Sequence, residues 1–228
     1  MIYNMHMRKT YTHVQLNEEM ISPTTEYQNG GRYYCIGNEK YPSVTTVTGW
    51  EKRNFFAKWR RENPLESKRV LSRGNNLHEA IEKYINNEED FLNDCNDNVV
   101  ELFNQMKPML DNIDNVHAQE VALWSGLLKL AGRVDCVAEY KGKLSIIDFK
   151  GSTNAKREKQ IENYFAQACA YAIMWQERFN KPIEQVVILI SNEDGITQEF
   201  ARDPREYVPT LKKMIDLYWE ENTQLINT

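Results

Sequence analysis

The sequence predicts an α/β fold in which helices flank a mixed central β-sheet. From residue 116 onward, apolar residues follow the period of strands, while the preceding segments follow the period of helices. The unbroken apolar run 186–190 suits a strand buried on both faces. Helices followed by strand, strand, strand, helix, strand, strand and helix are typical of layered α/β architectures with a mixed sheet.

The N-terminal part predicts an arm, a hairpin and three helices. Residues 1–30 show no clear period, so we expect a peripheral arm. Aromatic and β-branched residues flank the turn at Gly37-Asn38, which predicts a β-hairpin. Its strands are expected at 32–36 and 41–47, and helices at 54–61, 65–86 and 98–113, with Pro64 and an Asn/Asp-rich stretch between them.

The C-terminal part predicts the sheet and two further helices. Asn180 and Pro182 end one long helix, Asp194-Gly195 forms a turn, and Pro204 opens a last amphipathic helix. Strands are expected at 116–124, 128–140, 143–150, 186–190 and 196–200, and the long helix at 159–179. We expect one domain over 1–228, comprising the arm (1–30), a hairpin and helical part that binds nucleic acid (31–115) and an α/β core (116–228).

Composition predicts an intracellular globular protein. Of the 228 residues, 41% are hydrophobic and 27% are charged. No apolar stretch approaches the roughly 20 residues that span a bilayer, and the polar opening, residues 1–12, has no signal-peptide core. We therefore expect no membrane partner. The four isolated cysteines, Cys35, Cys95, Cys136 and Cys169, favour reduced thiols over disulfides or a cysteine-bound metal.

Charge is distributed unevenly about a net value of −5. Residues 51–73 contain eight basic and three acidic side chains, whereas residues 82–114 contain nine acidic and two basic ones. Aromatic residues are interleaved with the cations, an arrangement that suits single-stranded nucleic acid because bases stack and phosphates attract cations. Arg53, Trp59 and Arg73 are the candidate contacts. The alternative is that the charges form solvated helix faces and the aromatic residues anchor a helix to the core.

A tight turn predicts that two aspartates face each other. If Lys141-Gly142 is a two-residue hairpin loop, paired positions sum to 283. Asp135 then lies directly opposite Asp148 on one face of the sheet, with Cβ atoms about 5 Å apart. The other face would carry the apolar pairs Val134 with Phe149 and Cys136 with Ile147.

Facing carboxylates in an apolar hairpin predict a bound cation. They repel each other unless something positive lies between them, and a divalent cation is the natural occupant. Lys150 projects from the same face about 7 Å beyond Asp148 and could hold a water or a phosphate oxygen. Hard oxygen ligands and a nearby cation are what phosphodiester hydrolysis needs. The alternative is a surface hairpin in which these side chains form a solvated face.

Four motifs between residues 41 and 171 resemble the PD-(D/E)xK nuclease superfamily and its RecB-like branch. Within that branch the chain resembles mitochondrial genome maintenance exonucleases and their phage-encoded relatives. The motifs are Tyr41-Pro-Ser-Val-Thr-Thr46, Arg73-Gly-x-x-x-His78, Gly132-x-x-Asp135 with Ile147-Asp-Phe-Lys150, and Gln167-x-x-x-Tyr171. The resemblance implies a restriction-endonuclease-like core, here with an N-terminal hairpin and helical elaboration.

The resemblance also implies a role for each matching residue. It implies that His78 binds a metal together with Asp135 and Asp148, and that the backbone carbonyl of Phe149 is a further ligand. It implies that Lys150 assists the attacking water. Gln167 and Tyr171 would line the site and place the DNA strand.

Reasoning from the residues alone leaves several of these roles open. His78 and Glu82 share a helix face and could approach one ion, yet a lone histidine is more often structural. Gln167 and Tyr171 share a face with Tyr164, beside an apolar stripe that reads equally well as core. Two supporting acids are expected in Glu82 and, on the strand before the hairpin, Glu120. Gly151 departs from the small hydroxyl residue typical of the family, although Ser152 follows it and is a candidate DNA contact.

These observations predict a Mg²⁺- or Mn²⁺-dependent deoxyribonuclease without an iron–sulfur cluster. The first hypothesis is an exonuclease acting on free or single-stranded DNA ends in replication, recombination or repair. The alternatives are a structure-dependent endonuclease of the same superfamily and a non-catalytic DNA-binding recombination factor. We expect a cytoplasmic location in a prokaryotic or virus-infected cell.

Overall fold

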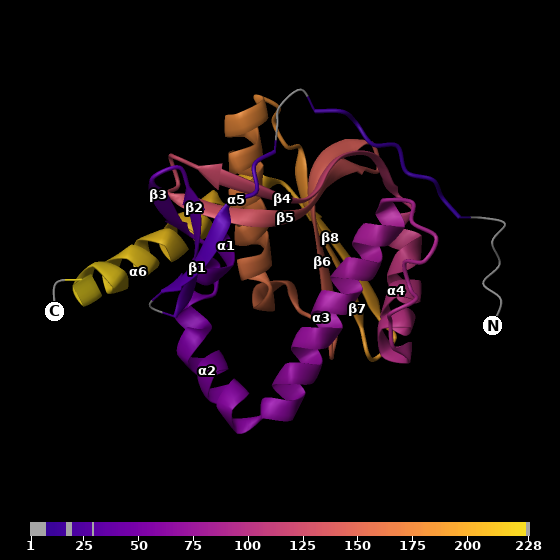
Figure 1. Cartoon of the computed structure of the whole chain (residues 1–228), viewed down its shortest axis with the longest axis horizontal. Helices are drawn as coiled ribbons and strands as arrows, with labels where there is room; N and C mark the ends of the chain where they lie inside the picture. The colour runs from indigo at the N-terminus through magenta and orange to yellow at the C-terminus, as the bar shows by residue number, and fades with distance from the viewer. Residues whose placement is uncertain (1–7, 17–19, 29, 227–228) are drawn as a thin grey trace.

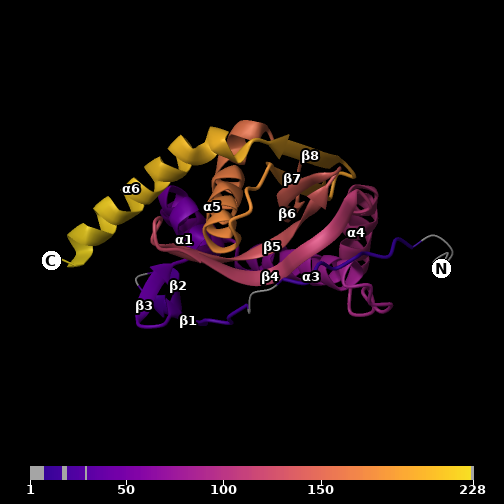
Figure 2. The same cartoon turned by 90° about the horizontal axis from the view of Figure 1, so that it is seen from above.

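A five-stranded mixed sheet forms the centre of the protein (Figures 1 and 2). The computed structural model describes residues 8–16, 20–28 and 30–226. Strands β6 and β7 run parallel, and the other neighbouring pairs run antiparallel. In spatial order the strands are β4 (Ile113–Ser125), β5 (Leu130–Tyr140), β6 (Lys143–Ser152), β7 (Gln185–Asn192) and β8 (Thr197–Arg202). The predicted α/β fold with a mixed sheet is confirmed.

Helices cover both faces of this sheet and divide its core in two. Helix α5 (Glu162–Phe179) packs on one face with α1 (Val44–Thr48) and α6 (Val208–Ile226). Helices α3 (Pro64–Ile85) and α4 (Asp97–Leu110) pack on the other. Strand β7 is buried along almost its whole length because it faces both clusters, as its apolar run predicts. In the described part of the chain, no helix is both long and apolar enough for a membrane span.

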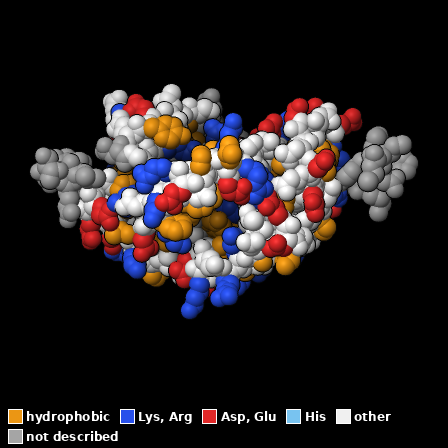
Figure 3. All heavy atoms as spheres, turned by 90° about the horizontal axis from the view of Figure 1, so that it is seen from below, with side chains coloured by type: hydrophobic (Ala, Val, Ile, Leu, Met, Phe, Trp, Pro, Cys, Tyr) orange, Lys and Arg blue, Asp and Glu red, His pale blue; other side chains and the backbone are white. Residues whose placement is uncertain are grey.

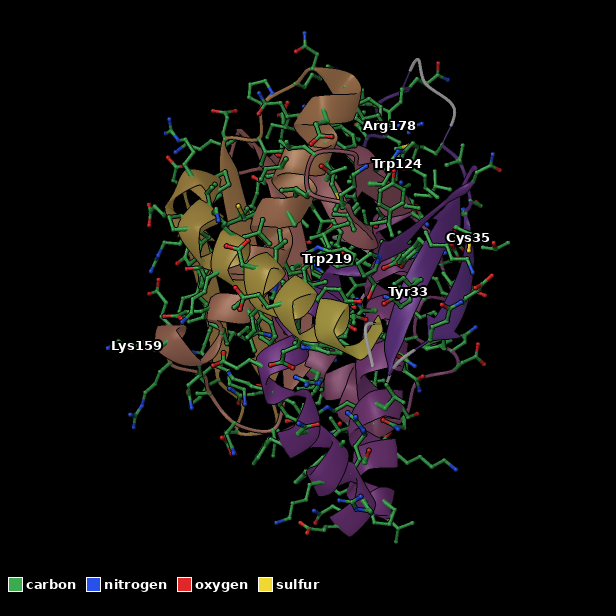
Figure 4. All side chains as sticks on the ribbon, turned by 90° about the vertical axis from the view of Figure 1, so that its left-hand side faces the viewer. Tyr33, Cys35, Trp124, Lys159, Arg178 and Trp219 are labelled. Carbon is green, nitrogen blue, oxygen red and sulfur yellow. The ribbon has the colours of Figure 1, made fainter. Side chains whose placement is uncertain are left out.

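The N-terminal hairpin is shorter than predicted and is followed by a helix. Strand β2 (Gly31–Ile36) pairs with β3 (Glu39–Pro42), and residues 44–48 are helical, not part of a strand. The reason is local: the Ser43 side chain caps α1 by accepting a hydrogen bond from the Thr46 backbone N–H. Tyr33 joins the hairpin to α6 through a 2.5 Å hydrogen bond between its hydroxyl and that of Tyr218 (Figure 4).

Parts of the expected peripheral arm are integral to the fold. Residues Thr24–Gln28 form β1, which adds a third strand to the hairpin. Tyr11 is buried against α3 and α4, and its hydroxyl donates to the Leu110 carbonyl. His13 bridges to Val116 at the start of β4. These two residues contact partners far along the chain, which local periodicity does not reveal. Residues 1–7, 17–19 and 29 of the arm lie outside the described residues.

Two helices meet in a V that projects from the core (Figure 1). The short helix η2 (Trp50–Lys52) leads into α2 (Arg53–Glu62), which buries none of its residues. Helix α3 begins at Pro64 immediately afterwards and runs back to the sheet. Its C-terminal half buries one face against the core, whereas Leu65 and Leu71 nearer its start are exposed. The predicted helices at 54–61 and 65–86 are therefore confirmed, whereas the third helix ends at Leu110, before the predicted residue 113, which begins β4.

The turn between β5 and β6 adopts the predicted two-residue geometry. Lys141 and Gly142 both have positive φ, 52° and 78°, as a type I′ hairpin requires. Tyr140 pairs with Lys143, and the same register continues to Cys136 opposite Ile147. Asp135 and Asp148 occupy the next position along, where the ladder ends.

The β5–β6 ladder ends before Asp135, because the Asp135 side chain accepts a hydrogen bond from the backbone of β6. The Phe149 backbone N–H donates to Asp135 Oδ2 at 3.1 Å instead of to a carbonyl of β5. Alternation breaks at the same point: Val134 packs in the α5 cluster, whereas Cys136 packs in the α3 and α4 cluster with Phe149. The prediction that Val134 and Phe149 share an apolar face is therefore wrong, and the interruption opens the sheet at the carboxylates.

The last helical segments follow the prediction with a short lead-in. A 3₁₀ turn, η3 (Glu158–Gln160), precedes α5, and another, η4 (Pro204–Tyr207), precedes α6. Asn180 ends α5 in the left-handed conformation, which asparagine tolerates well. Helix α5 therefore begins at Glu162, slightly later than the predicted residue 159.

Candidate functional site

Three potential metal ligands from three elements converge at the break in the sheet. His78 on α3, Glu120 on β4 and Asp135 on β5 each offer one atom, and these atoms lie within 4.8 Å of one another. Glu120 faces Asp135 because the β4–β5 ladder places Gln119 opposite Cys136 and Val121 opposite Val134. Glu120 itself has a positive φ of 48°, so the backbone of β4 is distorted at the site. His78 Nδ1 is 3.5 Å from Asp135 Oδ2.

Asp148 and Lys150 form an ion pair beside this cluster, in which Asp148 is buried and Lys150 is partly buried. Only 3% of Asp148 is exposed, and its Oδ2 is 2.6 Å from Lys150 Nζ. Burial raises the pKa of Asp148, Lys150 opposes that rise, and the charge of Asp135 adds to it. Burial disfavours the charged form of Lys150, but the two aspartates outweigh it and raise its pKa. In this structure, the two charges of the pair compensate each other.

Two carboxyl groups at the site, those of Glu120 and Glu82, have raised pKa values. Burial, followed by the charges of Asp135 and Glu82, raises the pKa of Glu120 to about 7. Glu82, one turn beyond His78 on α3, also has a raised pKa because of burial. Carboxylates crowded in this way favour a divalent cation, and a donor set of carboxylate oxygens and one imidazole suits Mn²⁺ and related ions. The residues present therefore fit a divalent metal.

Helix α5 supplies polar side chains that contact the other side of the site. Gln167 Nε2 donates to Asp148 Oδ1 at 3.3 Å. Tyr171 is buried against Gly132, where a Cβ would come within 2.6 Å of its hydroxyl. Lys150 Nζ lies 5.2 Å from the centre of the Tyr164 ring. Sequence reasoning gave Tyr164 no role, although its spacing of three residues from Gln167 is a signal that could have identified it.

Two arginines expected to contact DNA instead bind protein groups. Arg53 stacks on Trp50, with Cζ 3.9 Å from the ring centre, and forms an ion pair with Glu221 of α6. Arg73 is buried and forms an ion pair with Glu193 at 2.6 Å. Their contacts with DNA stay predictions. To make such a contact, either guanidinium would have to exchange its protein partner for a phosphate.

The remaining sequence candidates lie at varied distances from the cluster. Trp59 is half-buried on α2, in the V, whereas the carboxylates lie on the strands. Ser152 is buried, and its hydroxyl donates to the Asn154 carbonyl. The ring of Phe149 is buried in the core and lies 6.4 Å, centre to centre, from His78. The backbone N–H of Phe149 is already bonded to Asp135, so the peptide chain at Phe149 borders the site.

The V carries three cations that are available to an external anion. Within the described ranges, Arg60, Arg61 and Lys68 are exposed and form no ion pair. They share this surface with Phe55 and Phe56, which are 66% and 45% exposed. On the side toward which the V points, Lys and Arg side chains lie next to apolar ones, with acidic groups among them (Figure 3). Several other cations of residues 51–73 have protein partners, so the charge count of this segment exceeds its number of unpaired cations.

Two known proteins are similar in sequence to most of this chain. Mitochondrial genome maintenance exonuclease 1 of Mus musculus is 26% identical over 198 residues, covering 78% of this chain and 58% of that protein. The Homo sapiens protein of the same name is 28% identical over 174 residues, covering 68% of this chain and 50% of that protein. The chain thus spans little more than half the length of these relatives.

Structural and family comparisons identify the fold and the superfamily. The crystal structure of a candidate exonuclease from Eubacterium rectale superposes with a TM-score of 0.50 at 10% identity, covering 69% of this chain and 67% of that one. At this identity the likeness shows the fold alone. The family model of the PD-(D/E)XK nuclease superfamily matches residues 97–224, from α4 into α6. Because this match covers more than half of the chain, the protein belongs to the PD-(D/E)XK nuclease superfamily.

Proposed function

We propose that this nuclease is a metal-dependent DNA exonuclease that hydrolyses phosphodiester bonds at free or single-stranded ends. The observation that carries the proposal is the convergence of His78, Glu120 and Asp135 within 4.8 Å, next to the ion pair of buried Asp148 and partly buried Lys150. A surface hairpin with solvated acids would not bring a helix histidine and a buried aspartate to the same place.

The residues divide the chemistry among them. His78, Asp135 and Asp148, with Glu120 and the Phe149 carbonyl in support, would hold Mg²⁺ or Mn²⁺. When bound, such an ion acts as a Lewis acid on a phosphate oxygen. Lys150 would turn its ammonium from Asp148 toward the attacking water or a phosphate oxygen. Gln167 keeps Asp148 oriented, and Tyr171 forms the wall behind Gly132 that places the strand.

The exposed V supports a single-stranded substrate. Its apolar and cationic side chains can stack bases and attract phosphates without reading base edges, which favours end-dependent degradation over cutting at a defined sequence. The relatives are named as exonucleases, which supports the same choice. We propose action in DNA replication, recombination or repair in the cytoplasm of a prokaryotic or virus-infected cell, although the relatives are named as mitochondrial.

A comparison of DNA forms tests the proposal. Purified protein is incubated with linear and circular single-stranded DNA, and with linear and circular duplexes, in Mg²⁺, in Mn²⁺ and in EDTA. We expect metal-dependent degradation of linear molecules, with circles intact. Cutting of circles would establish the endonuclease alternative. Binding without cutting in either metal would favour the non-catalytic recombination factor.

A further inference from the structure

Arg73 is a buried cation that joins helix α3 to the end of strand β6. Only 4% of it is exposed, and its guanidinium donates to the Gly151 carbonyl and the Thr153 hydroxyl, each at 3.3 Å. Gly151 directly follows Lys150. A Cβ at Gly151 would come within 3.0 Å of Leu77 on α3, so helix and strand are in close contact here. The spacing between α3 and β6 therefore depends on how Arg73 is held.

Glu193, in the turn between β7 and β8, holds Arg73. Its Oε1 accepts from Arg73 at 2.6 Å and from Arg69, one turn earlier on α3, at 2.5 Å. Its backbone N–H donates to the Ser152 carbonyl at the end of β6. A single residue thus contacts α3 through its side chain and β6 through its backbone.

These contacts join α3 to β6 close to the residues of the proposed metal site. His78 is five residues beyond Arg73 on α3, and Asp148 and Lys150 directly precede the segment that Arg73 contacts on β6. Removing the carboxylate would leave a buried guanidinium without its counter-charge. Because an uncompensated buried charge is strongly unfavourable, Arg73 would move toward solvent and take the His78-bearing helix with it.

We propose that Glu193 is a positioning residue: by holding Arg73 and Arg69 it sets helix α3 against β6 so that His78 can share a metal ion with the carboxylates. The inference rests on the proposed function, because it concerns the same metal site. Glu193 touches none of the potential ligands, so its effect is transmitted through Arg73.

The test measures metal binding and catalysis separately in Glu193→Ala and in the near-isosteric Glu193→Gln. Binding of Mn²⁺ to metal-free protein is followed by titration calorimetry, and kcat and KM are measured with linear single-stranded DNA. We expect Mn²⁺ affinity to fall about 10- to 100-fold, as for other residues that orient metal ligands. We also expect kcat to fall at saturating DNA while KM for DNA is unchanged.

A matched control separates positioning from general stability. Glu158 forms an equally close ion pair with Arg202, 2.7 Å apart, between η3 and β8, away from α3. Glu158→Gln should lower the melting temperature less, because this pair is more exposed, and it should not change Mn²⁺ affinity. Wild-type Mn²⁺ affinity in both Glu193 variants, or an equal fall in Glu158→Gln, would overturn the inference while leaving the proposed function intact. A wild-type protein that neither binds Mn²⁺ nor cuts DNA would overturn both.

Discussion

Asp148 lies in β6 between the Lys150 ammonium and the Gln167 amide. Each of these groups contacts one of its carboxylate oxygens. No described contact of Asp148 involves the exposed cations of the V. Removing its charge should therefore impair chemistry and leave DNA binding to the V intact. A substitution of Asp148 can therefore distinguish cleavage from DNA binding.

We predict that Asp148→Ala abolishes cleavage, lowering kcat by more than about 100-fold, while affinity for single-stranded DNA is retained. Cleavage of a labelled oligonucleotide and fluorescence anisotropy measure the two properties. Asp148→Asn should behave in the same way with less disturbance of packing. The exposed Asp194→Asn, in the β7–β8 turn, is the control, and retained cleavage in Asp148→Ala would remove this residue from the mechanism.

Gly132 tests the wall formed by Tyr171. Its missing Cβ leaves room for the Tyr171 side chain, because a Cβ there would lie 2.6 Å from the Tyr171 hydroxyl. We predict that Gly132→Ala lowers the free energy of unfolding by about 1–3 kcal/mol through overpacking, and also lowers kcat because Tyr171 must move. Gly126→Ala, where a Cβ would meet nothing within 4 Å, is the control in chemical denaturation. Equal stability of the two variants would show that Tyr171 is not tightly held.

At the scale of elements, α2 and the start of α3 form the proposed DNA-binding unit. We predict that changing Arg60, Arg61 and Lys68 together to glutamine weakens binding and lowers the salt dependence of log K by about 0.7 for each phosphate that the variant no longer neutralises. The unfolding free energy should change little, because all three side chains are exposed and form no ion pair among the described residues. Binding is measured by anisotropy from low to moderate salt.

The matched control for this charge removal lies on α6. Lys212 forms an exposed i,i+4 pair with Asp216, far along the chain from the V. Lys212→Gln should leave the salt dependence of DNA binding unchanged. A triple variant on the V that binds with wild-type salt dependence would place the DNA elsewhere on the protein.

The hairpin of β5 and β6 is the element for which sequence reasoning was most informative. A two-residue turn determines which residues pair, since each further pair follows from the one before. The register from Tyr140–Lys143 to Cys136–Ile147 is as predicted. The prediction failed where Asp135 bonds to the Phe149 N–H, because pattern reasoning assumes that backbone groups pair only with backbone groups.

At the scale of the whole molecule, Glu193 links α3, β6 and the β7–β8 turn, and its titration should affect global stability. Hydrogen bonds from Arg69, followed by those from Arg73, lower its pKa to about 2 from the ordinary value of 4.5. A carboxylate with a lowered folded pKa contributes stability above its unfolded pKa and loses it as the pH falls toward the folded one. The contribution of Glu193 should therefore be complete above about pH 4.5 and absent toward about pH 2.

We predict that wild type exceeds Glu193→Gln in unfolding free energy by about 2 kcal/mol at pH 6, and that the difference disappears as the pH approaches 2. Urea denaturation at a series of pH values measures it. Side-chain exposure of 19% for Glu193 means that solvent screens the interaction only in part. A difference that stays constant with pH would mean that the Glu193 charge does not contribute.

The sequence by itself determined the features that depend on neighbours along the chain. Hydrophobic period, turn residues and helix-ending residues were sufficient for the mixed sheet, for helices α2 to α6 with shifts of a few residues at their ends, and for the hairpin register. The same local logic places Asp148 and Lys150 on one face of β6, since side chains two residues apart project alike.

Only the tertiary structure decided how distant elements meet. The approach of His78 to Asp135 and Glu120 joins a helix to two strands, and the distorted backbone at Glu120 has no counterpart in the period of β4. The sequence also gives no indication that Arg73 pairs with Glu193 or that Arg53 pairs with Glu221. The physical reason is that side-chain contacts across the core depend on packing in three dimensions, whereas periodicity and turn chemistry are properties of adjacent residues.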